Sequence, residues 1–412
     1  MRLADIGALP AGGVNRQALT TGEAAAWRLV LGWATEDGLV PSVDPVGNLF
    51  LSLPGRDRSL PPILAGSHLD TQPTGGKFDG AFGTLAALEA VLGLAADGHV
   101  PERDVTVVAW MNEEGSRFAP SIMGSATFAG ARTLAETRAV QDADGISVGQ
   151  ALDTLLSAFP DLPRRELGFI PAFYLEAHIE QGPVLEQHGI PIGIVTGIQG
   201  KTTWAITVTG EEGHAGTLAM ADRRDALASF AAMAQAMHSE IGVDPAIKFT
   251  VGRVELSPNA PSVVPARVSF RVDLRHPDNA VLNAMGERVE ALARQHAGPC
   301  TVEIVQLSHA ASNSFDPTLR EAIKAAASAR GIASSPILSA AGHDARYLAP
   351  LCPSAMIFIP CRDGVSHAEH EWAEPTHVAA GAAILGDVIR QLAFAPGPGH
   401  GVPSGRGSPL AQ

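Results

Sequence analysis

Residues 63–71, Ile-Leu-Ala-Gly-Ser-His-Leu-Asp-Thr, begin with an apolar run at 63–66 that turns abruptly polar. A second apolar run at 105–111 ends in the same way, and between the two lie leucines at helical spacing, followed by Gly98 as a stop signal. Short runs rich in β-forming residues are typical of buried strands. The order strand, helix, strand therefore predicts an α/β fold with a mostly parallel central sheet, whose functional groups lie at the carboxyl ends of its strands.

A different pattern begins near residue 200. Strands are predicted at 204–209, 248–256, 266–275 and 301–307, with helices at 222–241 and 279–296. This β-α-β-β-α-β order is that of a ferredoxin-like domain. The helix predicted at 317–330, the strand at 355–359 and the helix at 378–392 resemble the first part of the chain again. We therefore predict a discontinuous main domain (1–199 and 309–394), an inserted domain (200–308) and a disordered Pro/Gly/Ser-rich tail (395–412).

The composition is that of a folded acidic protein. Its 412 residues exceed what one hydrophobic core normally serves, and 43 acidic against 29 basic side chains give a net charge of −14. Such a charge repels nucleic acid and anionic lipid, so we expect neither as a partner. Its three cysteines indicate no disulfide framework or thiolate zinc site, and we see no signal peptide or apolar run of membrane-spanning length. We expect a cytoplasmic protein.

Two polar clusters follow the first two predicted strands. His68 and Asp70 lie two residues apart and share a face, so the carboxylate could fix the tautomer of a metal-binding imidazole; a capped strand end is the alternative. Asp79 stands in a glycine-rich turn before the helix, where a turn or helix-cap aspartate is the simpler interpretation. Of Glu113 and Glu114, one could bind metal while its neighbour acts as general base, although an acidic loop in water is equally compatible.

Two further segments carry histidines. His178 has a glutamate two residues away on either side, and His367 follows the strand predicted at 355–359. Five residues at strand ends or adjoining turns could then bind metal together: His68, Asp79, Glu114, His178 and His367. Imidazole and carboxylate ligands in this number, with one carboxylate able to bridge, suit two divalent ions ~3.5–4 Å apart. Zinc is the expected metal, with manganese, cobalt or nickel as alternatives.

Two apparent motifs do not indicate a different chemistry. Gly145-Ile-Ser147-Val-Gly149 has the spelling of a nucleophile elbow but follows no buried strand, and we interpret Ser147 as a helix-capping residue. The His-Glu pair at 370–371 lacks the second histidine of an H-E-x-x-H zinc motif.

Taken together, the motifs resemble the superfamily of co-catalytic metallohydrolases that contains aminoacylases and carboxypeptidases. More narrowly they resemble its amidase branch, with beta-ureidopropionase, N-carbamoyl-L-amino-acid hydrolase and allantoate amidohydrolase. The resemblance spans about residues 12–392, and its blocks include Gly66-Ser-His-Leu-Asp-Thr, Asn112-Glu-Glu-Gly-Ser-Arg-Phe, His178-Ile-Glu-Gln-Gly-Pro, His214-Ala-Gly-Thr and Asp363-Gly-Val-Ser-His.

The resemblance implies a role for each residue. One ion would be bound by His68, Asp79 and His178, and the other by Asp79, Glu114 and His367. Glu113 would be the general base. The inserted domain would be a lid that forms a homodimer, with the catalytic His214 reaching the substrate across the interface and Arg275 binding the substrate carboxylate. Further substrate contacts are expected from Gln181, Asn259, Ser262, Gly342 and His343. Relatives commonly have Asn where this chain has Ser262, which leaves the identity of the substrate open.

The activity implied by this resemblance is hydrolysis of the ureido C–N bond of an N-carbamoyl-L-amino acid or N-carbamoyl-β-alanine, giving amino acid, carbon dioxide and ammonia. Allantoate amidohydrolase is the nearest alternative, because allantoate carries the same chemical group. A dipeptidase or N-deacylase of the same superfamily is the next. A non-catalytic binding protein is the alternative from a different class.

Overall fold

The computed structural model describes residues 2–394, and the tail predicted to be disordered lies outside this range. The described residues divide into two compact units, the first made of residues 2–195, 315–337 and 343–394 and the second of residues 196–314 and 338–342. No helix of the described residues combines the length and the apolar character needed to cross a bilayer.

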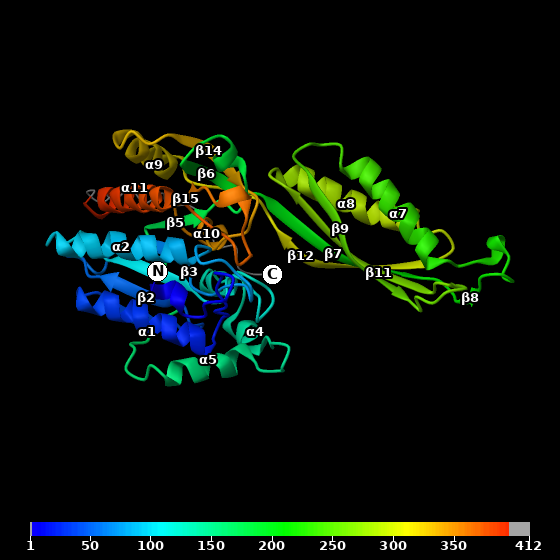
Figure 1. Ribbon diagram of the computed structural model, residues 1–412, viewed down its shortest axis with the longest axis horizontal. Helices are drawn as coiled ribbons and strands as arrows, with labels where there is room; N and C mark the ends of the chain where they lie inside the picture. Colours follow the sequence, from blue (N-terminus) through cyan, green and yellow to red (C-terminus); the bar gives the residue numbers. More distant parts are fainter. Residues whose placement is uncertain (1, 395–412) are drawn as a thin grey trace. The chain divides into compact units, whose positions relative to one another are not determined.

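A nine-stranded sheet, formed mostly by residues of the first unit, organises that unit (Figure 1). Its strands are β1 (Val40–Val43), β2 (Leu49–Leu53), β3 (Ile63–His68), β4 (Val105–Trp110), β5 (Phe173–Ile179), β6 (Ile192–Ile198), β13 (Asn313–Ser314), β14 (Ser334–Ser339) and β15 (Ser354–Ile359). Their order is β1-β2-β4-β3-β5-β15-β6-β13, with β14 beside β6. The four central strands β4, β3, β5 and β15 are parallel to one another. They are almost wholly buried, as continuous apolar runs in a parallel sheet require.

Helices cover this sheet. They are α1 (Thr21–Glu36), α2 (Ala81–Ala96), α3 (Met123–Phe128), α4 (Leu134–Ala139), α5 (Val148–Ser157), α6 (Val184–Gln187), α9 (Pro317–Ala329), α10 (Ala345–Leu348) and α11 (Pro375–Phe394), with short 3-10 turns η1 (Arg2–Asp5) and η3 (Arg362–Gly364). Helix α11 packs against α2, α9 and β15, so segments from both ends of the chain share one core. Ser147 caps α5 through a capping box with Gln150, which confirms its interpretation as a helix-capping residue.

The close fit of α2 on the sheet depends on a glycine. A Cβ atom at Gly83 would lie 2.0 Å from the carbonyl oxygen of Ala177 in β5. The helix can therefore approach the strand that carries His178 only because residue 83 has no side chain. In this way the packing of α2 sets the position of one candidate ligand.

The second unit is the predicted ferredoxin-like fold. Its main elements are β7 (Gly200–Thr209), α7 (Ala226–Ile241), β9 (Lys248–Ser257), β11 (Arg267–His276), α8 (Asn279–Gln295) and β12 (Thr301–Ala310). The strands form an antiparallel sheet in the order β12-β7-β11-β9. Alternate residues of β7, among them Trp204 and Ile206, are buried in a separate core together with residues of α7 and α8. A two-stranded ribbon joins β8 (Gly213–His214) to β10 (Val263–Val264).

Several predicted boundaries differ from the structure by a few residues, among them the starts of β7 and α11. The first strand extends to His68 rather than ending at residue 66, so this histidine belongs to the strand itself. The helix predicted from residue 222 starts at Ala226, because Asp225 accepts hydrogen bonds from the backbone N–H groups of Leu227 and Ala228 and so caps it. The preceding residues Met220–Asp222 form a separate 3-10 turn, η2.

Candidate metal centre

The five residues predicted to bind metal come together in the first unit as two sets that share Asp79. His68, Asp79 and His178 form one set, and Asp79, Glu114 and His367 form the other; within each set the ligand atoms lie within 4.8 Å of one another. Oδ1 of Asp79 lies 3.1 Å from Nε2 of His178 and 3.5 Å from Nε2 of His68. Its Oδ2 lies 3.3 Å from Nε2 of His367. Each oxygen of Asp79 thus faces a different set, an arrangement that fits a bridging carboxylate.

The fold explains how distant residues converge. His68 ends β3 and His178 lies near the end of the neighbouring parallel strand β5, so both reach the same edge of the sheet. Asp79 precedes α2 and is followed by Gly80, which has a φ of 62° and at which a Cβ atom would lie 2.3 Å from the His68 ring. Only glycine lets the loop pass this closely over the imidazole. The carboxylate of Asp79 points to the histidines and makes no cap to the helix.

The two buried histidines are oriented by backbone carbonyl groups. Nδ1 of His68 is 2.9 Å from the carbonyl oxygen of Asp70, and Nδ1 of His178 is 2.9 Å from that of Ile179. With such a partner at Nδ1, the lone pair of each ring lies on Nε2, the nitrogen that faces Asp79 and that would bind a metal. The carboxylate of Asp70, expected to hold the imidazole, is 3.6 Å from Nδ1 of His68. It instead accepts hydrogen bonds from the backbone N–H groups of Glu113 and Glu114, at 3.1 and 3.2 Å.

The adjacent glutamates have different surroundings. Glu114 belongs to the second set, with Oε2 3.3 Å from Nε2 of His367, and accepts hydrogen bonds from the backbone and side chain of Gln72. Glu113 belongs to neither set, although its Oε2 lies only 3.6 Å from Nε2 of His68. Burial, reinforced by nearby carboxylates such as Asp344, raises the pKa of Glu113 well above its usual range, although His68 acts in the opposite direction. A buried carboxylate beside the ligands but outside both sets is suited to accept a proton.

The carboxylates of Asp79 and Glu114 give the site a negative charge that favours binding of a cation. Burial acts to raise the pKa of Asp79, but hydrogen bonds with His178, His367 and His68 outweigh it and hold the pKa well below its usual range. Burial and the neighbouring Asp79 raise the pKa of Glu114 to about 7. The imidazole and carboxylate groups of the site surround the two oxygens of Asp79. First-row transition metals bind such groups, so these residues fit a pair of divalent ions.

The two sets differ in exposure. The side chains of His68 and His178 are 1% exposed, whereas that of His367 is 49% exposed. Gln181, predicted to bind substrate, lies at the open side: its Nε2 is 2.8 Å from Oδ2 of Asp79 and 3.2 Å from the hydroxyl of Ser366. Its Oε1 is buried and has no hydrogen-bond partner among the described residues. An acceptor is therefore available beside the second set.

Three residues near His178 belong to neither ligand set: His343, Glu176 and Glu180. His343 is buried, and its ring packs against that of His178 with centroids 4.5 Å apart, which places it behind a ligand. Burial, with the neighbouring His178, lowers the pKa of His343 well below its usual range. Glu176 accepts hydrogen bonds from Ser67 and Tyr174, and Glu180 from the backbone of α6, so neither flanking carboxylate is a hydrogen-bond partner of His178.

The other predicted substrate-binding residues, except Gly342, lie in or beside the ribbon and sheet of the second unit. His214 in β8 is exposed and pairs with Val263 of β10. Asn259 and Ser262 both have positive φ values, 53° and 62°, in the loop before β10. In β11, Nε and Nη2 of Arg275 donate to Asp273 at 2.8 and 3.2 Å. Nη1 donates to the carbonyl group of Ala340, the second residue before Gly342.

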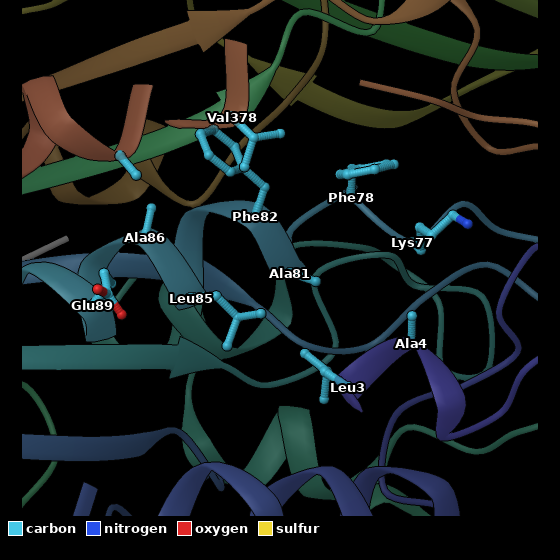
Figure 2. A pocket seen from close by; sticks show the side chains of 11 residues that line it. Leu3, Ala4, Lys77, Phe78, Ala81, Phe82, Leu85, Ala86, Glu89 and Val378 are labelled. Atoms are coloured by element: carbon cyan, nitrogen blue, oxygen red, sulfur yellow. The ribbon is translucent and has the colours of Figure 1, made fainter. Parts of the chain in front are cut away.

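A cavity elsewhere in the first unit contains none of these residues. It has a volume of about 350 Å³ and lies between η1, α2 and α11, where apolar side chains such as Leu3, Phe82 and Val378 line it (Figure 2). Lys77 and Glu89 are the charged residues of its lining. Without convergent polar groups it lacks the chemistry of a catalytic site.

Sequence reasoning gave no role to Ser366 and Glu371. The Ser366 hydroxyl lies 2.7 Å from Oδ2 of Asp79, and Glu371 accepts the backbone N–H groups of Phe78 and Asp79. The only signal was their place in the same segment as His367. A serine and a glutamate beside a histidine are too common for that signal to suffice.

Comparisons with known proteins agree with this geometry. The model of peptidase family M20/M25/M40 matches residues 64–391. An N-carbamoyl-L-amino-acid amidohydrolase of Rhizobium meliloti is 40% identical over 95% of this chain and 94% of its own length. An allantoate amidohydrolase of Escherichia coli (strain K12) is 34% identical over 95% of this chain and 96% of its own. The crystal structure of an amidase of the hydantoinase/carbamoylase family from Burkholderia multivorans superposes with a TM-score of 0.86 at 41% identity, covering 96% of each chain. The chain therefore belongs to peptidase family M20/M25/M40, within which it is similar to amidohydrolases.

Proposed function

We propose that this protein is a metal-dependent amidohydrolase that cleaves the ureido C–N bond of an N-carbamoyl-L-amino acid, releasing the amino acid, carbon dioxide and ammonia. The observation that carries the proposal is the pair of ligand sets sharing Asp79, with the carboxylate of Glu113 beside them but in neither. The amidohydrolases to which the chain is similar over nearly its full length support this substrate class.

His68, Asp79 and His178 would hold one ion, and Asp79, Glu114 and His367 the other. When bound, such ions supply Lewis-acid charge and make water more acidic. Zinc is the metal we expect, because two imidazoles and a carboxylate with an open position form a common catalytic zinc site.

Glu113 would move the proton. Its carboxylate takes a proton from the attacking water, and the oxygen of that water bonds to the carbamoyl carbon. Glu113 then delivers the proton to the nitrogen that leaves as ammonia when its bond to that carbon breaks. The carbamic acid that remains on the other nitrogen loses carbon dioxide, which breaks the second C–N bond and releases the amino acid. The backbone bond from Glu113 to Asp70 fixes the start of this side chain, so the carboxylate stays near the ligands throughout.

The substrate would be held at both ends. Oε1 of Gln181, to which no group of residues 2–394 donates, is available to accept an N–H group of the ureido moiety. Arg275, oriented by Asp273, would bind the carboxylate of the substrate in a bidentate manner, with Asn259, Ser262 and the Gly342 backbone as further contacts. His214 would complete the site from the second subunit of a homodimer formed through the second unit. We place the enzyme in the cytoplasm, where its three free, buried cysteines stay reduced.

A substrate panel tests the proposal. Purified protein is stripped with a chelator, restored with zinc, manganese, cobalt or nickel in turn, and assayed for ammonia release from N-carbamoyl-L-amino acids, N-carbamoyl-β-alanine and allantoate, with a dipeptide and an N-acetyl amino acid as controls. We expect metal-dependent turnover, greatest for an N-carbamoyl-L-amino acid. Greatest turnover of allantoate would assign the chain to the second candidate, which the similarity to allantoate amidohydrolases favours. No turnover of any compound by the metal-loaded protein would refute the proposal.

A further inference from the structure

The two ligand sets are supported in different ways. In the first set, His68 and His178 are both buried, and each has a backbone carbonyl group 2.9 Å from its Nδ1. In the second set, Nδ1 of His367 has no hydrogen-bond partner among the described residues, and its side chain is half exposed. The usual support of a metal-binding histidine is therefore missing from the second set. Another group must hold its geometry.

Glu371 links two of the three loops that carry the second set, those of Asp79 and His367. Its Oε1 accepts hydrogen bonds from the backbone N–H groups of Phe78 and Asp79, at 2.9 and 3.1 Å, across nearly three hundred residues of chain. Its Oε2 lies 3.0 Å from the hydroxyl of Ser366, the residue before His367. The same hydroxyl lies 2.7 Å from Oδ2 of Asp79, so its single hydrogen can be donated to either carboxylate. The carboxylate of Glu371 thus holds both the backbone N–H group of Asp79 and the loop that carries His367.

The surrounding chain is closely packed around this carboxylate. Glu371 is 1% exposed, and a Cβ atom at Gly76 would lie 2.0 Å from its carboxyl group. Both oxygens of Glu371 already have partners in the protein, so the residue is not itself placed as a ligand. Its contacts are with the groups behind Asp79 and His367.

We propose that Glu371 is the positioning residue of the second metal site: through Ser366 and the Asp79 peptide it replaces the missing partner of His367 and sets the affinity of the ion bound by Asp79, Glu114 and His367. This inference rests on the metal pair of the proposed function. The first ion depends on Glu371 much less, because its two histidines have supports of their own.

Zinc titration of the full-length protein tests this. Wild type and the variants Glu371→Ala, Glu371→Gln and Ser366→Ala are stripped and titrated with zinc against a competing chelator, and zinc per chain is measured by elemental analysis. Loss of a partner behind a metal ligand typically weakens metal binding by about 10- to 100-fold. We expect about 100-fold weaker binding of the second ion in Glu371→Ala and about 10-fold in the other two variants. The first ion should stay within a few-fold of wild type.

Asp44→Ala is the matched control. Asp44 is also 1% exposed, and its Oδ1 accepts the backbone N–H groups of Val46, Gly47 and Asn48, but it touches no ligand loop. Its loss should lower the unfolding temperature without changing the affinity for either ion. If Glu371→Ala behaves like Asp44→Ala, Glu371 is merely structural and the inference is wrong. If Glu371→Ala does not fold, Glu371→Gln and Ser366→Ala decide by the same criterion.

The outcomes for wild type separate this inference from the proposed function. Uptake of two zinc ions without hydrolysis of any ureido compound would refute the function and leave the inference to be decided by the variants. Uptake of fewer than two ions would refute the inference directly.

Discussion

Glu113 and Glu114 are adjacent glutamates. Replacing each by glutamine in turn therefore compares the effect of the same chemical change at the proposed base and at a proposed metal ligand. Glu114 belongs to a ligand set and Glu113 does not. Glu113→Gln keeps the shape of the side chain and the backbone bond to Asp70 but removes the group that accepts a proton. Glu114→Gln replaces a charged ligand by a neutral one.

The expected size of each effect follows from the role proposed for the residue. General base catalysis contributes about 10²- to 10⁴-fold to a rate, so Glu113→Gln should lower kcat by that factor, or about 3 to 5 kcal/mol in the barrier. It should leave two ions per chain. Because burial disfavours the charged form of Glu113, the neutral amide should not lower the stability of the metal-free protein. Glu114→Gln should lose the second ion first and lose activity with it.

Three measurements on the same preparations decide the matter: kcat at saturating N-carbamoyl amino acid, metal content by elemental analysis, and thermal unfolding after chelation. Activity of Glu113→Gln within about 10-fold of wild type, at full metal content, would remove Glu113 from the role of base. Loss of metal from Glu113→Gln would show instead that it is a ligand.

Three further predictions concern stability and substrate binding. Burial, reinforced by Asp70, raises the pKa of Glu23 from 4.5 to about 7 in the folded chain, so the folded state keeps a proton that the unfolded state releases, and stability is lost as the pH rises from about 4.5 through about 7. This loss amounts to about 3 kcal/mol at most, and Glu23→Gln should abolish it in denaturant titrations compared at about pH 5 and about pH 8. Arg275→Lys should raise KM about 10- to 100-fold with little change in kcat. The reason is that lysine weakens a charged hydrogen bond of about 1.5–3 kcal/mol that the enzyme makes both to the substrate and to the transition state. A selective fall in kcat would contradict this. Gly83→Ala should destabilise by about 1–3 kcal/mol because its Cβ would meet the Ala177 carbonyl group, whereas Gly93→Ala, on the same helix with open space around it, should not destabilise; equal effects in unfolding experiments would be inconsistent with the packing of α2.

The sequence contained enough to predict the elements that carry the site. The apolar runs that became β3 and β4 each end in polar residues, and both the central sheet and the ferredoxin-like order of the second unit follow from such local patterns. The convergence of the five candidate ligands could also be predicted from their places at strand ends, because parallel strands bring their carboxyl ends to one edge of a sheet.

Local sequence patterns do not predict which groups hold those ligands in place. Asp70 was expected to hold His68 with its carboxylate, yet the carbonyl group of the same residue does so, a choice set by the turn after β3. Glu371 reaches the Asp79 loop from the far end of the chain, and no spacing rule connects residues so distant. Substrate contacts such as Ser262 and Asn259 lie in a loop with positive φ values, whose path depends on its tertiary surroundings.

The place of β15 in the central sheet has a consequence for synthesis of the protein. This late strand inserts between β5 and β6, which are made much earlier. Until the ribosome has released residue 359, a nascent chain therefore carries two strands with open edges in the middle of its future sheet. Such edges invite pairing with other chains. Premature termination before β15 should accordingly yield insoluble product rather than a shortened enzyme, and the last ligand, His367, joins the centre only after β15 has been made.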